Sequence, residues 1–445
     1  MAPANDGVSL GWGWPHFSLL RILPAVRSFR SFPEFPPAHY HSSMLRFTTA
    51  GESHGQALVA ILEGIPAGLR LAAADVDRDL ARRQQGYGRG RRMQIEHDTA
   101  QLLSGVRAGE TLGSPIAMLI ANRDWKNWQE IMDPAALESD PAPRRRAVTR
   151  PRPGHADLSG MLKYDRRDAR DILERASARE TTARVAAGAI CRRFLSEFGV
   201  TIASHVVHLG GIDARRPEPL PADLNAAADQ SPLRTLDPEA DRRMVERIDA
   251  IKREGNTLGG IAEVVCDGLP VGLGSHVSWD RKLDGRLAAA LMSIPAIKAV
   301  EIGLGFQAAR VTGAEAHDEI ELSPGRTVTG NVRRRTNRAG GLEGGITTGE
   351  PLVLRVGMKP ISTLMRPLAT VDVATGEPAS AVAERSDVTA VPAMAVIAEA
   401  MAAFVLAQAF LEKFGGDAMA ETRRNVASYL STLAANMTAP ADHDA

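Results

Sequence analysis

The sequence predicts a folded protein that mixes α-helices with β-strands. Short apolar runs bounded by glycine, as at residues 58–62, are typical of buried strands. A much longer segment, residues 168–198, repeats apolar side chains at the spacing of a helix. The chain has 445 residues, of which 44% are hydrophobic, so it can bury a large core. Length alone would fit about two to three domains.

The first predicted elements follow Met44, which begins a strand-like segment. The apolar run at residues 58–62 predicts a second, buried strand. Residues 75–85 predict a helix with Asp75 as its N-cap and a stop at Gly86. Later apolar runs predict strands at residues 261–266 and 352–358.

Residues 168–198 predict the longest helix, which Gly199 closes. Small and apolar side chains form its predicted buried stripe, so another element can pack closely against it. This stripe consists of Ala183, Ala186, Ala187, Ile190 and Phe194. In the same segment Arg175 and Arg179 are four residues apart, which predicts that both lie on one helical face.

The most hydrophobic run, residues 393–411, is long enough to span a membrane. It is rich in alanine and contains Glu399, so we interpret it as a core helix that begins at Pro392 and ends at Gly415. We expect the tail after Gly416 to fray.

Residues 1–43 differ from the rest of the chain in their tryptophans, prolines and arginines and in the lack of any sustained period. A targeting peptide is one interpretation. We favour a poorly ordered upstream extension that follows from a misplaced start codon. The chain then divides into this extension, one main domain at 44–415 and a tail at 416–445.

The charges of the chain balance, with 53 basic and 53 acidic residues. A broad nucleic-acid-binding face usually gives a positive bias, so this class of protein is disfavoured. The two cysteines, Cys191 and Cys266, are far apart and match neither a disulfide framework nor a metal site. This usage of cysteine fits a reducing cytoplasm.

Two histidines stand beside glycines, where backbone and ring can approach a ligand closely. His54 lies in Ala-Gly-Glu-Ser-His-Gly at 50–55, and His155 lies in Arg-Pro-Gly-His-Ala-Asp at 152–157. An isolated histidine is more often structural, but prolines stiffen the loop that presents His155 together with Arg152. Two histidines among many arginines describe a pocket for a polyanion on which proton chemistry occurs.

Other polar segments add to this pattern. Arginine and glycine alternate at residues 82–93, which predicts either a mobile loop that closes over an anion or a solvated basic loop. A glycine-rich segment at 337–349, with residues 359–363 after it, could cradle a phosphate or a flat ring. It matches neither a P-loop nor a dinucleotide-binding fingerprint. Asp387, close to Arg385, could orient or accept a proton.

From residue 44 to residue 415 the chain resembles the chorismate synthase family. The matching segments follow the family's order and lie at 46–55, 82–93, 150–157, 175–181, 292–298, 339–345, 359–363 and 385–387. The family converts 5-enolpyruvylshikimate 3-phosphate to chorismate and phosphate, in the shikimate route to aromatic compounds. This 1,4-elimination by a carbon–oxygen lyase has no net redox change, yet it requires reduced FMN.

The chemistry of that reaction accounts for the residue types. The substrate carries two carboxylates and a phosphate, roughly four negative charges near neutral pH. Arginines suit such a ligand because their planar forks bind carboxylate and phosphate oxygens. The hydrogen that is lost is poorly acidic, so an ordinary side-chain base is inadequate and the resemblance implies that reduced flavin carries the difficult chemistry.

The resemblance also implies an α+β fold, a β-α-β sandwich with helices between antiparallel sheets. It implies a homotetramer in the cytoplasm that acts on a small-molecule substrate and needs neither nucleic acid nor membrane. The chain has no added segment that resembles a flavin reductase, so we expect an external source of reduced flavin, with NADPH as an indirect reductant at most.

By position, the resemblance implies catalytic roles for His54, His155 and Asp387. His54 would protonate or stabilise the departing phosphate, His155 would stabilise the anionic reduced flavin, and Asp387 would assist proton movement at the flavin. The implied substrate-binding residues are Arg83, Arg89, Arg92, Arg152, Ser177, Arg179 and Arg385. The implied flavin-binding residues are Arg175, Ala176, Ser177, Pro295, Ala296, Gly344, Lys359, Pro360, Ile361, Ser362, Thr363 and Arg385. Arg83 and Arg89 also match positions that are linked to a nicotinamide nucleotide.

Two other classes of protein share parts of this pattern. A flavoprotein that is a net oxidoreductase would use the glycine-rich cradle but would need neither two histidine motifs nor so many arginines. An RNA-binding module would rest on the Gly-Tyr-Gly-Arg-Gly-Arg-Arg run at 86–92. The neutral net charge and the lack of an aromatic stacking platform oppose this second class.

Overall fold

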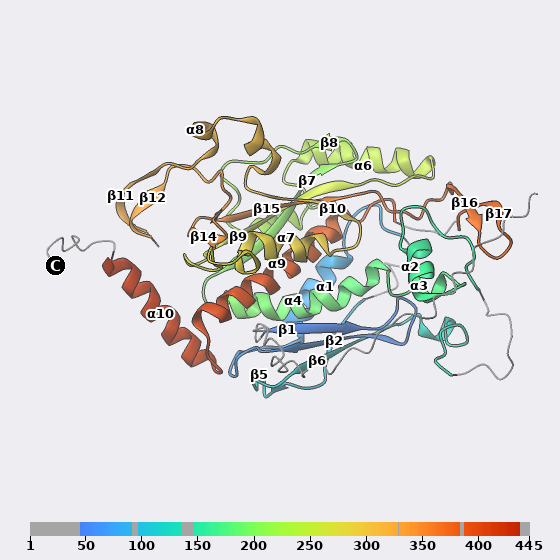
Figure 1. Cartoon of the computed structure of the whole chain (residues 1–445), viewed down its shortest axis with the longest axis horizontal. Helices are drawn as coiled ribbons and strands as arrows, with labels where there is room; N and C mark the ends of the chain where they lie inside the picture. Colours follow the sequence, from blue (N-terminus) through green and yellow to red (C-terminus); the bar gives the residue numbers. More distant parts are fainter. Residues whose placement is uncertain (1–44, 91–96, 136–145, 328, 383–386, 437–445) are drawn as a thin grey trace, which may run out of the picture. The chain divides into compact units, whose positions relative to one another are not determined.

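A computed structural model describes residues 45–90, 97–135, 146–327, 329–382 and 387–436 (Figure 1). The expected extension at 1–43 lies outside these residues, as do Arg92 and Arg385. In the described part of the chain, two antiparallel sheets enclose a layer of helices (Figure 1). The α+β sandwich that the resemblance implies is therefore confirmed.

The sheets have four and five strands. The first runs in the order β1 Arg46–Ala50, β2 Ala57–Glu63, β6 Ile116–Ala121 and β3 Gln101–Leu102. The second runs in the order β10 Ile297–Ile302, β15 Leu352–Met358, β9 Gly260–Asp267, β7 Thr201–Leu209 and β8 Ile212–Asp213. Each predicted strand falls within one of these sheets.

Four two-stranded hairpins complete the strands of the described residues. They pair β4 Val106–Arg107 with β5 Glu110–Thr111, β11 Ile320–Thr327 with β12 Gly330–Arg334, β13 Leu342–Glu343 with β14 Ile346–Thr347, and β16 Ala369–Asp372 with β17 Glu377–Ser380. Glycines in left-handed conformations support several of the turns, for example Gly109 between β4 and β5.

The helices that lie between the sheets are α1 Ala73–Gln84, α4 Thr181–Ser196, α7 Leu283–Met292 and α9 Val391–Phe414 (Figure 1). The remaining helices are α2 Asp157–Tyr164, α3 Arg170–Leu173, α5 Leu224–Ala228, α6 Pro238–Arg253, α8 Gly313–Ala316 and α10 Met419–Asn436. The expected core helix is α9: 89% of its most apolar stretch is buried in the fold. Pro392 and Gly415 mark its ends as expected.

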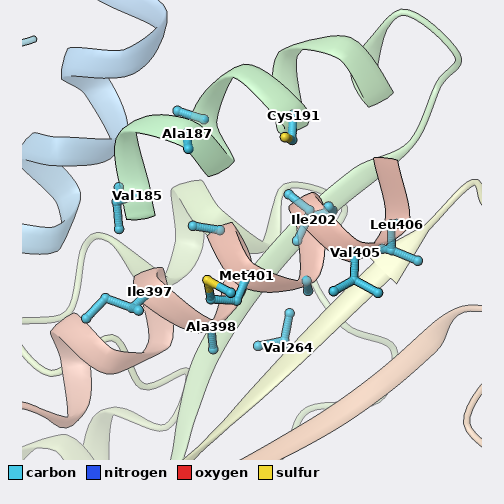
Figure 2. Close-up of a cluster of buried hydrophobic side chains, with 14 of the residues drawn as sticks. Val185, Ala187, Cys191, Ile202, Val264, Ile397, Ala398, Met401, Val405 and Leu406 are labelled. Atoms are coloured by element: carbon cyan, nitrogen blue, oxygen red, sulfur yellow. The ribbon is translucent and has the colours of Figure 1, made fainter. Parts of the chain in front are cut away.

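Small side chains let α4 and α9 pack closely in the centre of the sandwich. Ala187 and Cys191 of α4, Ala398 and Met401 of α9, and Val264 of β9 lie in one apolar cluster (Figure 2). A Cβ atom on Gly188 of α4 would come within 2.5–2.6 Å of the Cβ, Cα and carbonyl oxygen of Ala400. The two backbones therefore touch at a point that admits no side chain.

Two expectations for helices need correction. Asp75 is not the N-cap of α1 but its third residue, where its carboxylate accepts from Ala72 N at 2.9 Å. Residues 168–198 do not form one helix: α3, a short 3-10 turn (η3, Ala178–Glu180) and α4 replace it. The break lies at Ser177, whose ψ of 145° is extended.

The tail after Gly416 also differs from expectation, because most of it forms the 18-residue helix α10. Met419 and Val426, two turns apart, are buried against the main core. Thr422 donates to the carbonyl of Gly415 at 2.9 Å, which ties the first turn of α10 to the end of α9. The apolar residues of this segment therefore predict its structure better than its position near the end of the chain does.

A buried charge network in the helical layer reaches the five-stranded sheet through Ser204 of β7, whose hydroxyl donates to Glu399. Glu399 of α9 is fully buried, and Arg82 of α1 donates to both of its oxygens at 2.8 and 3.0 Å. Arg192 of α4 and Arg234 also bond to this carboxylate. Burial alone raises the pKa of Glu399, but the neighbouring arginines outweigh it and hold the pKa well below its ordinary value. Arg82 therefore belongs to the core and not to the basic loop in which the sequence placed it.

Gly188→Ala should destabilise the protein by about 1–3 kcal/mol, because the new methyl group meets backbone that cannot move freely. Gly285 in α7 is a matched control, since a Cβ there would meet no atom within 4 Å. Gly285→Ala should stabilise the protein by about 0.5–1 kcal/mol because it restricts the unfolded chain. Urea unfolding of both variants tests this, and equal effects would contradict the proposed close contact.

A second carboxylate predicts how stability depends on pH. Glu263 of β9 is buried with Arg216 at 2.7 Å and His205 at 3.2 Å. Burial raises its pKa, but bonds from His205 and Arg216 outweigh this and lower the pKa to about 2 from 4.5. Because the folded pKa is the lower one, its stabilisation is complete above about pH 4.5 and is lost as the pH falls toward 2. The free energy of unfolding should fall across this range, and it should fall less in Glu263→Gln.

Candidate active site

His54 is held by a buried carboxylate. The loop between β1 and β2 presents it, and Nδ1 lies 2.8 Å from Glu174 Oε2. The backbone N–H of His54 donates to the same oxygen at 3.0 Å, and Arg170 donates to Oε1 at 2.8 Å. Burial raises the pKa of Glu174, but these bonds outweigh it and the pKa lies below its ordinary value. A charged carboxylate therefore fixes the imidazole through Nδ1, and Nε2 is the nitrogen that does not face Glu174.

The turn after α3 packs against the loop that carries His54. Ser177 donates to Ser53 Oγ at 3.2 Å, and Ser53 N donates to the carbonyl of Glu174 at 2.9 Å. Arg175 donates to the carbonyls of Gly51 and Thr49 at 3.0 and 2.9 Å. The expected Ser177 thus lies beside the histidine loop, while Arg175 braces the end of β1.

Arg175 and Arg179 do not share a helical face, because the chain is extended at Ser177 between them. Arg179 donates instead to Asp98 at 3.1 Å. Arg83, at the end of α1, donates to Thr181 Oγ1 and to the carbonyl of Ala178, both at 2.9 Å. Its Nη1 is 3.8 Å from Asp98, so one buried carboxylate lies between two of the expected substrate arginines.

His155 has a carboxylate partner of its own. Its Nδ1 lies 2.5 Å from Oδ1 of Asp157, which is fully buried at the first residue of α2. Arg152 donates to Asp157 Oδ2 at 2.8 Å and to Thr363 Oγ1 at 3.0 Å. Burial raises the pKa of Asp157, but His155 and then Arg152 outweigh it and hold the pKa well below its ordinary value. Asp157 is therefore charged and holds both side chains.

The 359–363 segment lies against the His155 loop. Lys359 Nζ bonds to the carbonyl of Gly154, and a Cβ on Gly154 would lie 3.6 Å from Ser362 Cβ. Lys359 N donates to the carbonyl of Ala296 at 3.0 Å, which brings the 295–296 turn to the same place. Ala296 has a φ of 69°, an uncommon conformation for a residue with a side chain. Two of the expected flavin-binding segments are thus brought together with His155.

Asp387 pairs with Arg89. Its Oδ2 lies 2.8 Å from Arg89 Nε, and its Oδ1 accepts from Gly90 N at 2.6 Å. Gly344 lies in the β13–β14 turn, where the described atom nearest to a Cβ would be His276 Cβ at 3.9 Å. Asp387 is therefore paired with an expected substrate arginine, whereas the described residue nearest to Gly344 is His276.

One segment joins the two histidine groups. Asp157 begins α2, and Glu174 directly follows α3. The two helices pack so closely that a Cβ on Gly160 would come within 2.4 Å of Ile172 Cγ2. Both carboxylates that hold the histidines therefore come from residues 157–174 and keep a fixed relation to each other.

Sequence reasoning missed Glu174, Asp157 and Asp98 as site residues. Glu174 directly precedes the matched segment 175–181, and Asp157 is the last residue of the matched segment 150–157. The signal for Asp157 was its distance of two residues from His155, which permits a local side-chain bond. Asp98 had no comparable signal, because its partners Arg83 and Arg179 are remote in sequence.

Two half-buried histidines, each bonded to a buried carboxylate and close to arginines, form the kind of site that suits an enzyme acting on an anionic small molecule. A model of one family, "Chorismate synthase", matches residues 45–411. The chain belongs to the chorismate synthase family. It is a lyase of the shikimate pathway and converts 5-enolpyruvylshikimate 3-phosphate to chorismate and phosphate.

Curated relatives and a solved structure agree with this assignment. The chain is 58% identical to the chorismate synthase of Symbiobacterium thermophilum over 88% of its length and 100% of that protein. It is also 58% identical to the Geobacter metallireducens enzyme, over 88% of this chain and 99% of the other. A crystal structure of chorismate synthase superposes with a TM-score of 0.70 at 45% identity and covers 88% of this chain and 98% of that one.

Glu174→Gln should lower kcat by about tenfold or more, because an amide holds neither the His54 ring nor the Arg170 charge as the carboxylate does. Steady-state kinetics with reduced flavin in excess measure this. The matched control is Asp171→Asn, which changes an exposed carboxylate on α3, the short helix that Glu174 directly follows. A folded Glu174→Gln enzyme with ordinary kcat would contradict the role of this pair.

Proposed function

We propose that the enzyme works with reduced FMN bound beside His155, and that His54 and Asp387 move the protons of the reaction. The observation that carries this proposal is the pair of histidines, each bonded to a buried carboxylate of one α2–α3 segment. Protonation of a leaving group by one histidine and stabilisation of negative charge by the other both need rings in fixed orientations, which these carboxylates provide.

The residues near His155 fit a flavin mononucleotide. The 359–363 segment offers one ammonium group and two hydroxyls, from Lys359, Ser362 and Thr363, and a phosphate group can accept hydrogen bonds from all three. Arg152 lies beside them. Pro360 and Ile361 complete this segment, and Pro295, Ala296, Arg175 and Ala176 are further proposed contacts. When bound, reduced flavin would supply the electron density and the hydrogen acceptor that the elimination needs.

The proposed substrate site lies among the arginines. Arg83 and Arg179 meet at Asp98, so their guanidinium groups are already held before a ligand arrives. Preorganised donors bind the carboxylates and phosphate of the substrate without losing much freedom. Arg89, Arg152 and Ser177 are the other described members of the substrate site, and Arg92 and Arg385 remain proposals from the resemblance. Gly344 remains a proposed flavin contact.

His54 is proposed to protonate the phosphate that leaves. With Nδ1 bonded to the Glu174 carboxylate, the proton for transfer is carried at Nε2. His155 is proposed to stabilise negative charge on the flavin ring, and Asp157 holds it through Nδ1. Asp387, bonded to Gly90 N and beside Arg89, is proposed to assist the proton movement at the flavin.

The remaining expectations become proposals about the cellular enzyme. We propose that residues 44–415 form one catalytic domain, that the chain assembles as a homotetramer in the cytoplasm, and that an external reductase supplies the reduced flavin. NADPH would act only as an indirect reductant, with Arg83 and Arg89 as its proposed contacts.

An anaerobic assay tests the proposed function. The purified protein is mixed with 5-enolpyruvylshikimate 3-phosphate and chemically reduced FMN, and chorismate absorbance and phosphate release are followed. Equal amounts of chorismate and phosphate over many turnovers, with the flavin still reduced, would support the proposal. Folded protein that binds FMN and forms no product would contradict it.

His155→Ala should reduce turnover strongly, by about 100-fold, while the substrate still binds. The reason is that the ring sits beside the proposed flavin segment and its loss leaves the Asp157 charge without one partner. Single-turnover kinetics and substrate binding measured separately distinguish the two effects. His208→Ala, which removes a β7 histidine paired with Asp213, is the matched control, and near-normal turnover in His155→Ala would remove its proposed role.

A further inference from the structure

The indole of Trp128 forms one side of the surroundings of His54. The two rings stack with centroids 3.7 Å apart and planes inclined by 24°. Trp128 Nε1 donates to Asp124 Oδ2 at 2.9 Å, which fixes the rotation of the indole. A half-buried aromatic ring at this distance leaves the imidazole little room to tilt.

One buried side chain, Asn122, holds both partners of this stack. It follows β6, and its Nδ2 donates at 3.3 and 2.9 Å to two carbonyls that flank His54. Its Oδ1 accepts from Asp124 N at 3.1 Å, in the turn that carries Trp128. Because one amide fixes both loops, the stack is part of the framework at the end of β6.

Charged groups surround the stacked pair. The Cζ atoms of Arg146 and Arg170 lie 5.0 and 5.3 Å from the centre of the Trp128 ring. Arg170 also bonds to Glu174, the partner of His54. Among the described residues, the charged groups in contact with one of the two rings include Glu174, Arg170, Arg146 and Asp124, and Glu52 lies in the same loop as His54. The indole face, which is electron-rich, is thus placed among cations.

We propose that Trp128 is a positioning residue for His54, an inference that rests on the proton-transfer role proposed above. Glu174 holds Nδ1, and the indole covers a ring face, so the imidazole keeps Nε2 in one place. A donor held in this way needs no reorientation when the phosphate leaves. Its contribution therefore belongs to kcat and not to substrate binding.

The contact can be measured in the full-length enzyme without flavin or substrate. An imidazole in contact with an indole quenches its fluorescence, so His54→Asn should raise the emission of the enzyme at a fixed pH. The increase should be absent when His54→Asn is made in a Trp128→Phe background and should persist in a Trp125→Phe background, three residues away. An increase of equal size in the Trp128→Phe background would overturn the stacked contact.

The functional arm compares Trp128→Leu with Trp128→Phe. The leucine variant should lose about tenfold or more in kcat with little change in KM, and phenylalanine, which can still stack, should restore most of the loss. Thermal unfolding of both variants checks that the fold is intact, and Trp125→Phe should keep ordinary activity. Ordinary kcat in a folded Trp128→Leu enzyme would overturn the positioning role.

The two arms separate this inference from the proposed function. If His54→Asn turns over normally, the proton-transfer role of His54 fails, and the positioning role fails with it. If His54→Asn is inactive and Trp128→Leu is not, only the inference about Trp128 fails. Loss of activity in both, with rescue by Trp128→Phe, supports both.

Discussion

The interior of this protein contains many arginines, and each buried guanidinium group needs a carboxylate close to it. Desolvation makes an unpaired charge costly, so the positions of the acids decide where the arginines can lie. Glu399 meets this need for Arg82, Arg192 and Arg234 at the junction of the helical layer with the second sheet. Asp98 meets it for Arg83 and Arg179 at the site. The same pairing therefore holds the core together and prepares the arginines that a polyanionic substrate meets.

The core could be predicted from the sequence because its signals are local. Hydrophobicity predicts the strand at residues 352–358, and a long apolar run between a proline and a glycine predicts the core helix. Both elements are present in the structure as β15 and α9. The break at Ser177 could not be predicted in this way, because tertiary bonds to Ser53 decide it. The charges that surround the α4–α9 contact were equally hidden, since Glu399 and its partners are distant in sequence.

The site shows the same division. The glycines next to His54 and His155 made both histidines candidates for the site, and the family resemblance predicted which arginines accompany them. What the sequence lacked was the set of acids that orient them, Glu174, Asp157 and Asp98, because a carboxylate becomes part of a site only through its neighbours in space. The arginines that looked like a surface loop divide in the structure, with Arg82 in the core and Arg83 at the site. Arg82 and Arg83 are adjacent on α1, yet one stabilises the core and the other belongs to the candidate site.

The α2–α3 segment sets the spacing of the two histidines. The loops that carry His54 and His155 are remote from each other in the chain, and each histidine bonds to a carboxylate of this one segment. The close contact of Gly160 with Ile172 makes the segment rigid. An insertion or deletion in the turn between α2 and α3 would change the separation of the two histidines. The length of this segment is therefore a constraint on the geometry of the site, in addition to the identity of the residues that would touch the ligand.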